Sequence, residues 1–185
     1  MKDPTNKLSW DIDVHTRVYP LEEKHAAAVH QLITSNRTHL DQWLRWSSGI
    51  QTLQDAQQLI RQFEEKLGQG DGFMVGIWDN GALAGAVVCW YINRHNNNSE
   101  IGYWLGKQFT GKGLITRACE KAIHYLFEDE GLHRIEMQCG VENLKSRAIP
   151  ERLGFQLEGI RRDSHWITDR YVDHAVYSLI NPAAI

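Results

Sequence analysis

The sequence predicts an α/β domain of the α+β type, in which helices flank a mixed, mostly antiparallel sheet of about seven strands. Its 185 residues, 42% of them hydrophobic, suffice for one core. Segments with strand and helix periodicity follow the order β-α-α-β-β-β-α-β-α-β-β. A helical segment between the strands at 100–105 and 134–140 predicts a parallel crossover. We expect one domain over residues 1–185, with residues 1–10 flexible.

Periodicity and turn chemistry predict the elements one by one. In the first half they are a strand at 14–19, a helix at 21–34, a short helix or turn at 39–46, a helix at 52–68, and hairpin strands at 73–77 and 83–92. In the second half they are a strand at 100–105, a helix at 114–130, a strand at 134–140, a helix at 143–153, and strands at 155–160 and 171–179. Thr52 and Asp55 form a capping-box pattern that marks the start of one helix.

Composition excludes several classes of function. The 20 basic and 23 acidic residues give a net charge of -3, so we expect no direct nucleic-acid partner. Cys89, Cys119 and Cys139 form no Cys-x-x-Cys pair, and the start of the chain has no apolar signal region, so we expect a reduced, cytoplasmic protein. The apolar run at 83–92 is too short for a membrane span, and nine histidines show no zinc-type spacing, so we expect neither membrane nor metal.

The stretch from 99 to 118 carries the strongest functional pattern. A strand is followed by Gly111-Lys112-Gly113 and at once by a helix. Two glycines let the backbone approach an anion, and the first helical turn presents unpaired N–H groups. A dinucleotide fingerprint would need a third glycine after an early strand, and no Walker-type loop is present. The pattern alone predicts an anion site.

Further motifs narrow the interpretation. They are Glu-Ile-Gly-Tyr-Trp-Leu at 100–105, Gly-Lys-Gly-Leu-Ile-Thr at 111–116, Asn143-x-x-Ser146-Arg147, Glu-Arg-Leu-Gly-Phe at 151–155 followed by Glu158-Gly159, the 39–46 segment, and Tyr171-x-Asp173 with Tyr177-Ser178-Leu179. In this order they resemble the GNAT superfamily of acetyl-coenzyme A dependent N-acetyltransferases. The similarity extends to the branch that contains the ribosomal-protein serine and alanine acetyltransferases, and it spans nearly the whole chain.

The resemblance implies a GNAT fold in which acetyl-coenzyme A lies where the sheet splays, between the strands at 100–105 and 134–140, and leaves as coenzyme A. Its pantetheine arm would follow Trp104 and Leu105 along an unpaired strand edge. The pyrophosphate would lie on the amides of Gly111, Lys112, Gly113, Leu114, Ile115 and Thr116. Lys112 and Arg117 would add charge, although a solvated turn lysine is the alternative for Lys112.

Three positions depart from the family pattern. Thr110 and Ile115 occupy the first and last places of the pyrophosphate motif, so backbone amides rather than side chains would carry the phosphates. A literal match begins at Gln108, too early relative to the helix. Pro150 stands where many members have the tyrosine that protonates the leaving thiolate, so the usual general acid is absent.

Two residues at 143–146 and two aromatics have alternative roles. Asn143 and Ser146 begin a helix, so one can simply cap it. The resemblance implies hydrogen bonds from Asn143 to the pantetheine arm and proton delivery to the sulfur by Ser146, which as a poor acid would need a relay. Trp43 and Trp46 are either core aromatics or an apolar wall near the substrate.

The reaction is attack of a neutral amine on a thioester. An α-amino group with a pKa of about 7.7–8.0 is about a tenth neutral near pH 7, so it needs only modest help. Glu100 is the first candidate base, directly or through water, and a solvated carboxylate is its alternative. His165 is the second candidate, against an ordinary surface histidine. Cys139 invites a rival acetyl-cysteine mechanism activated by His165, but a buried cysteine is commonly a small apolar residue, so we favour direct transfer.

These inferences predict a cytoplasmic acetyltransferase whose acceptor is the α-amino group of a protein, with a ribosomal protein as leading candidate. A small-molecule acceptor such as a polyamine, an antibiotic or an amino acid is the alternative within enzymes. A coenzyme A binding regulatory module with little turnover is the alternative outside them. A homodimer is plausible because this branch often associates.

Overall fold

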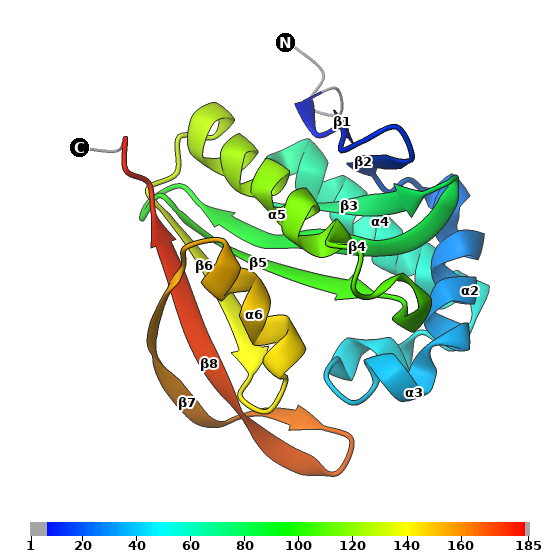
Figure 1. Ribbon diagram of the computed structural model, residues 1–185. Coiled ribbons are helices and arrows are strands. Elements are labelled where there is room, and N and C mark those ends of the chain that lie inside the picture. The colour runs from blue at the N-terminus through cyan, green and yellow to red at the C-terminus, as the bar shows by residue number, and fades with distance from the viewer. Residues whose placement is uncertain (1–6, 184–185) are drawn as a thin grey trace.

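The computed structural model describes residues 7–183 and shows one twisted sheet with helices on both faces (Figure 1). The strands are β1 (Trp10–Asp11), β2 (Thr16–Pro20), β3 (Phe73–Asp79), β4 (Ala82–Asn93), β5 (Asn98–Leu105), β6 (Arg134–Gly140), β7 (Gln156–Ile167) and β8 (Arg170–Ile180). Their order in the sheet is β1-β2-β3-β4-β5-β6-β8-β7. Every neighbouring pair is antiparallel except β5 and β6, which are parallel as predicted.

The helices are α2 (Ala26–Ser35), α3 (Arg37–Leu40), α4 (Leu53–Gln69), α5 (Leu114–His124) and α6 (Leu144–Arg152), and a π-helical turn at Tyr125–Asp129 continues α5. Short 3-10 turns lie at Glu23–His25, Arg45–Gly49 and Lys107–Phe109. The predicted capping box of α4 is present, because the Asp55 N–H donates to the Thr52 hydroxyl and the Thr52 N–H donates to the Asp55 carboxylate. The helix therefore begins where the sequence predicts.

Some predicted boundaries differ from the structure. The expectation of about seven strands missed β1, which is too short for a periodicity signal. Within the 1–10 stretch that was expected to be flexible, Leu8 is fully buried and Trp10 pairs with Val18, while residues 1–6 lie outside the described part of the chain. The last hairpin is longer than expected, since β7 runs to Ile167.

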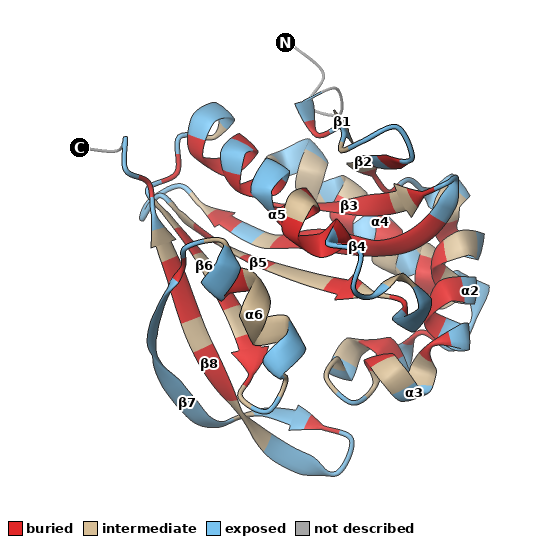
Figure 2. Cartoon of the chain, in the orientation of Figure 1, coloured by how far each residue is buried: buried red, intermediate tan, exposed pale blue. Residues whose placement is uncertain are grey.

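Two hydrophobic cores lie on opposite faces of the sheet (Figure 2). On one face α5 and α6 pack against the central strands, with Ile101, Cys119 and Met137 among the buried residues. On the other face α2 and α4 cover β3 and β4, with Ile60 and Trp104 among the buried residues. Because side chains alternate along a strand, odd-numbered residues of β5 face α5 and even-numbered ones face the opposite side.

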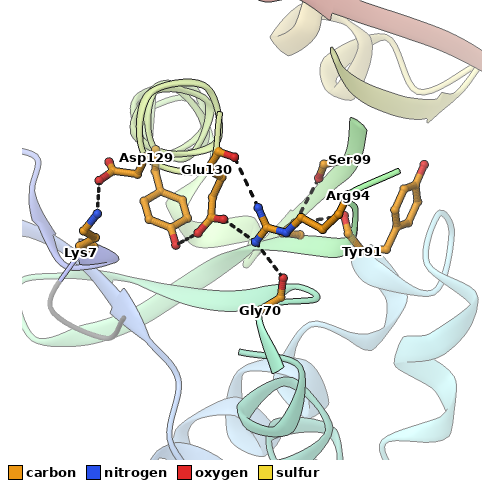
Figure 3. Close-up of polar contacts among 9 residues, drawn as sticks. Lys7, Gly70, Tyr91, Arg94, Ser99, Asp129 and Glu130 are labelled. Atoms are coloured by element: carbon orange, nitrogen blue, oxygen red, sulfur yellow. Dashed lines mark hydrogen bonds and ion pairs between the residues drawn. The ribbon is translucent and has the colours of Figure 1, made fainter. Parts of the chain in front are cut away.

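One end of the sheet is closed by polar contacts (Figure 3). Arg94, in the loop that leads from β4 to β5, lies 2.5 Å from Glu130 and donates to the Gly70 carbonyl at 3.2 Å. Nearby, Lys7 and Asp129 form an ion pair of 2.6 Å. These contacts hold the end of α4, the turn after α5 and the start of β5 together, at the end where β5 and β6 are paired.

We predict that Gly85→Ala destabilises the β4–β5 contact. A Cβ at Gly85 would lie 2.1 Å from the Trp104 carbonyl oxygen, so the strands would have to separate. The free energy of unfolding, measured in urea, should fall by about 1–3 kcal/mol. The matched control is Gly68→Ala in α4, where a Cβ meets nothing within 4 Å and stability should rise by about 0.5–1 kcal/mol. Equal stabilities would contradict the described approach of β4 to β5.

Candidate active site

The parallel strands β5 and β6 part soon after they begin (Figure 1). They pair only at 98–100 with 134–136. β5 then stays paired with β4 up to Leu105, and β6 stays paired with β8 up to Gly140. Each strand therefore follows its outer neighbour, and the inner edges at 101–105 and 137–140 are not paired with each other. We call the place where these two strands part the opening. Such edges carry backbone groups that can pair with the amides of an elongated ligand.

The turn after β5 carries the two glycines on which the predicted anion site depends. Gly111 and Gly113 have φ angles of 82° and 71°, in the left-handed region that favours glycine. Gly113 is the N-cap of α5, and its carbonyl accepts the first intrahelical hydrogen bond, from the Arg117 N–H at 3.2 Å. The backbone amides of 114–116, at the start of α5, therefore have no intrahelical partners. They lie at the positive end of the helix dipole.

Both cations expected at this turn are paired within the chain. The Lys112 Nζ lies 2.7 Å from the Asp79 Oδ2, and the carboxylate side chain is only 9% exposed. Arg117 forms an ion pair with Asp13. Their charges are thus partly neutralised by carboxylates, so the donors without a partner at the start of α5 are the backbone amides of 114–116.

A third cation, which the sequence analysis did not single out, lies at the same turn. The Arg152 Nη1, at the end of α6, donates to the Thr116 Oγ1 at 2.8 Å. The Thr110 hydroxyl donates to the Lys107 carbonyl at 2.8 Å, and Ile115 is buried. The contact between Arg152 and Thr116 places the first turn of α5 against the end of α6.

Three side chains from different elements meet across the opening. The Tyr103 hydroxyl of β5 donates to the Ser146 carbonyl of α6 at 2.8 Å and lies 3.4 Å from the Cys139 Sγ of β6. The Ser146 Oγ lies 3.2 Å from the Tyr103 hydroxyl and 3.3 Å from the Cys139 Sγ. Asn143 caps α6, since its side chain accepts from the Ser146 N–H at 3.2 Å. The structure brings Ser146, Asn143 and Cys139 together and adds Tyr103.

Both acidic groups of this cluster stay protonated. Burial raises the pKa of the Cys139 thiol above its ordinary value, and burial together with Cys139 raises the pKa of Tyr103 well above its own. A buried thiol is a weak nucleophile. Among the described residues no contact joins His165 to Cys139, because the partners of His165 are on the opposite face of the sheet.

The opposite face of the same strands carries Glu100. Its Oε2 accepts a hydrogen bond from the Gln138 Nε2 at 3.1 Å, and the Gln138 Oε1 accepts from the Arg161 Nη1 at 3.2 Å. Burial raises the pKa of Glu100, and the nearby Glu136 carboxylate adds to the effect. A half-buried carboxylate with a raised pKa is a stronger proton acceptor than an exposed carboxylate.

Two histidines lie together on the β7–β8 hairpin. The rings of His165 and His174 are 3.7 Å apart between centroids, and each Nδ1 lies near the Ser164 hydroxyl, at 3.2 and 3.4 Å. His174 pairs with Gly140 across the strands. Burial lowers the pKa of His174 to about 4 and also lowers the pKa of the more exposed His165. His174 was missed by the sequence analysis, because strand alternation alone gives it no chemical role.

The two tryptophans of the 39–46 segment border the opening from the α2–α4 side. Trp46 packs edge-on against Trp104 at 5.7 Å between ring centroids. A Cβ at Gly140 would lie 3.3 Å from the Trp43 ring, so the glycine lets Trp43 lie against the end of β6. Trp46 thus packs against the core, in agreement with the packing alternative, whereas Trp43 lies at the end of β6. The apolar wall near the substrate stays a prediction.

Two further features are absent from residues 7–183. No helix in this range is long and apolar enough to cross a membrane. Within the same range no group of three or more His, Cys, Asp or Glu side chains is arranged to hold a metal ion.

The fold and the parted strands place the chain in a class of acyltransferases. The family model of the acetyltransferase (GNAT) domain matches residues 16–156. The chain belongs to the GNAT family and is an N-acetyltransferase.

Individual relatives agree with this assignment. The putative ribosomal N-acetyltransferase YdaF of Bacillus subtilis (strain 168) is 35% identical over 172 residues, which cover 91% of this chain and 93% of the relative. The ribosomal-protein-serine acetyltransferase of Escherichia coli (strain K12) is 30% identical over 176 residues, which cover 95% of this chain and 96% of the relative. The structure of the microcin C7 self immunity acetyltransferase MccE, in complex with acetyl-CoA and AMP, is 28% identical with a TM-score of 0.86, covering 91% and 94%.

We predict that the buried His174 makes the protein less stable in mild acid. Its pKa of about 4 in the folded state is below the ordinary 6.5, so protonation favours the unfolded chain. Stability is full above pH 6.5 and falls as the pH drops toward 4. Urea unfolding should show a loss of about 1–2 kcal/mol between pH 7 and pH 5.

The comparison of His174→Gln with His124→Gln, an exposed histidine of α5, tests the assignment. His174→Gln should remove most of the loss between pH 7 and pH 5, whereas His124→Gln should keep it. An unchanged pH dependence in His174→Gln would show that other groups cause the acid sensitivity.

Proposed function

We propose that this protein transfers the acetyl group of acetyl-CoA to the α-amino group of a protein N-terminus, with a ribosomal protein as the leading acceptor. The observation that carries the proposal is the parting of β5 from β6 beside the N-terminus of α5. An open strand edge suits the amides of a pantetheine arm, and a helix N-terminus suits a pyrophosphate. The names of the two ribosomal-protein relatives support the choice of acceptor.

The residues that would hold acetyl-CoA follow from this geometry. Backbone groups of Trp104 and Leu105 would pair with the pantetheine arm, and the amides of 111–116 would bind the pyrophosphate. Arg152, which reaches Thr116, would add positive charge where Thr110 offers only one hydroxyl. The side chains of Trp104 and Ile115 are buried, so their contribution is through the backbone.

The two faces of β5 and β6 would contribute residues to different parts of the reaction. The amine nitrogen forms a bond with the thioester carbonyl carbon, the carbon–sulfur bond breaks, and the sulfur leaves with the electron pair. Glu100, on the α2–α4 side, would accept the proton of the amine directly or through water. Ser146, on the α5–α6 side, would donate a hydrogen bond to the leaving sulfur, and Tyr103, whose hydroxyl donates to the Ser146 carbonyl, would hold Ser146 in position.

Direct transfer fits these positions better than an acetyl-cysteine intermediate. The pKa of the Cys139 thiol is raised, so the thiol is seldom ionised, and its neighbours are hydroxyl groups rather than a base. His165, the predicted activator of Cys139, instead lies against His174. The cytoplasmic localisation, in the compartment where ribosomal proteins are made, stays a prediction. The homodimer also stays a prediction.

We predict that the product carries one acetyl group on the peptide α-amine. Purified protein, acetyl-CoA and peptides that begin with Ser or Ala would be compared with N-terminally blocked copies, with free amino acids and with a polyamine. Intact mass should show acetylation only of peptides with a free α-amine, and no acetyl group on Cys139.

Other products would contradict parts of the proposal. Acetylation confined to free amines or lysine side chains would contradict the N-terminal acceptor. Binding of CoA with no thiol release for any acceptor would favour a regulatory module. An acetylated Cys139 with parallel ping-pong kinetics would contradict direct transfer.

We predict that Glu100→Gln lowers kcat/KM about 100-fold at pH 7, because a positioned base contributes roughly 10²–10⁴-fold. The pH profile should also change. In the wild type, activity rises as Glu100 ionises, so the acidic limb of kcat/KM should be lost in the variant.

Glu136→Gln provides the matched control. The Glu136 carboxylate helps to raise the pKa of Glu100, so its removal should shift the acidic limb to lower pH while activity is kept. Full activity of Glu100→Gln from pH 6 to pH 9 would remove Glu100 from the mechanism.

A further inference from the structure

A small cavity adjoins the opening at the end of β6. Its volume is about 270 Å³. The residues that line it include Trp43, Gly140, Glu142, Arg170, Tyr171 and Asp173. Gly140 directly follows Cys139, so the cavity lies next to the cluster where the proposed reaction takes place.

The size of the cavity limits its occupant. Pockets for drug-sized ligands have volumes of about 300–1,000 Å³. A cavity just below this range has room for one side chain or one amine arm rather than for a whole nucleotide.

The residues that line the cavity favour the binding of a positively charged group. The rings of Trp43 and Tyr171 line the cavity, and aromatic rings attract cations to their faces. Glu142 and Asp173 contribute two carboxylates against the single guanidinium of Arg170, which leaves one net negative charge. Arg170 lies 3.5 Å from Glu142, but both side chains are more than half exposed, so this ion pair is weak and open to competition.

The backbone around Asp173 is fixed. Its carbonyl accepts from the Val141 N–H at 2.9 Å, and its Oδ1 accepts from the Asp163 N–H at 2.8 Å. These bonds tie β8 to the end of β6 and to β7. A carboxylate held in this way needs no reordering to meet a cationic group.

We propose that this cavity binds the cationic side chain of a lysine or arginine at the second or third position of the acceptor peptide. The inference rests on the proposed function, since it assumes that a peptide N-terminus enters the opening. The cavity then selects among N-termini by charge, while the amine itself reacts at the neighbouring cluster.

Kinetics on matched peptides test the proposal. Peptides that begin with Ser and carry lysine at position 2 or 3 are compared with copies that carry norleucine, which has a similar length and no charge. The ratio of kcat/KM for lysine over norleucine should be about fivefold to tenfold in the wild type. Glu142→Gln should reduce this ratio to within twofold, and Glu120→Gln, an exposed glutamate of α5, should leave it unchanged.

Binding measured by calorimetry separates this inference from the proposed function. N-acetylated forms of the same peptides are titrated into the protein in the presence of CoA, so that no turnover is needed. The lysine forms should bind about fivefold to tenfold more tightly. If the lysine forms bind more tightly but the free peptides are not acetylated, the result would support the cation subsite and contradict the proposed function. Acetylation with equal kcat/KM for lysine and norleucine, or a ratio unchanged by Glu142→Gln, would overturn the cation subsite.

Discussion

The short pairing between β5 and β6 is the constraint on which the rest of the structure depends. Three residues on each strand hold the two together, and the contacts of Arg94 and Glu130 strengthen the same end of the sheet. Beyond that end, β4 and β8 draw the strands apart. Had β5 and β6 stayed paired along their length, the strand edges would be used within the sheet and no opening would exist for a ligand.

The alternation of side chains then gives this opening two chemically different sides. Tyr103 and Cys139 face α5 and α6, where hydroxyl and thiol groups stay protonated. Glu100 and Gln138 face the other way, where the half-buried Glu100 carboxylate accepts a hydrogen bond from Gln138. Under the proposed function, the sulfur would lie on one side and the amine on the other, so they would meet only through the opening. This arrangement would suit direct transfer between two substrates rather than transfer through a protein side chain.

The sequence predicted the parts of the fold that rest on local chemistry. The capping box at Thr52 and the glycine turn are confirmed, because each depends on residues that are near in the chain. The parallel crossover is confirmed too, because a helical segment between two strands predicts it without any distant side-chain contact. The sequence could not show that Lys112 pairs with Asp79, 33 positions away, or that Tyr103 meets Ser146, 43 positions away. Such contacts depend on how strands and helices stack, and a single sequence carries no local signal for them.

The proline at position 150 is consistent with the two chemically different sides of the opening. Pro150 lies buried within α6 and offers no hydroxyl, so the groups nearest to the parted strands are Tyr103 and Ser146. The raised pKa of Tyr103 makes it a poor proton source, and its O–H is donated to the Ser146 carbonyl, which leaves the Ser146 hydroxyl as the nearby hydrogen-bond donor. Stabilising a thiolate requires only such donors, because a thiol has a pKa near 8.5 and the departing group can take its proton from water. The missing acid therefore does not argue against turnover in this chain.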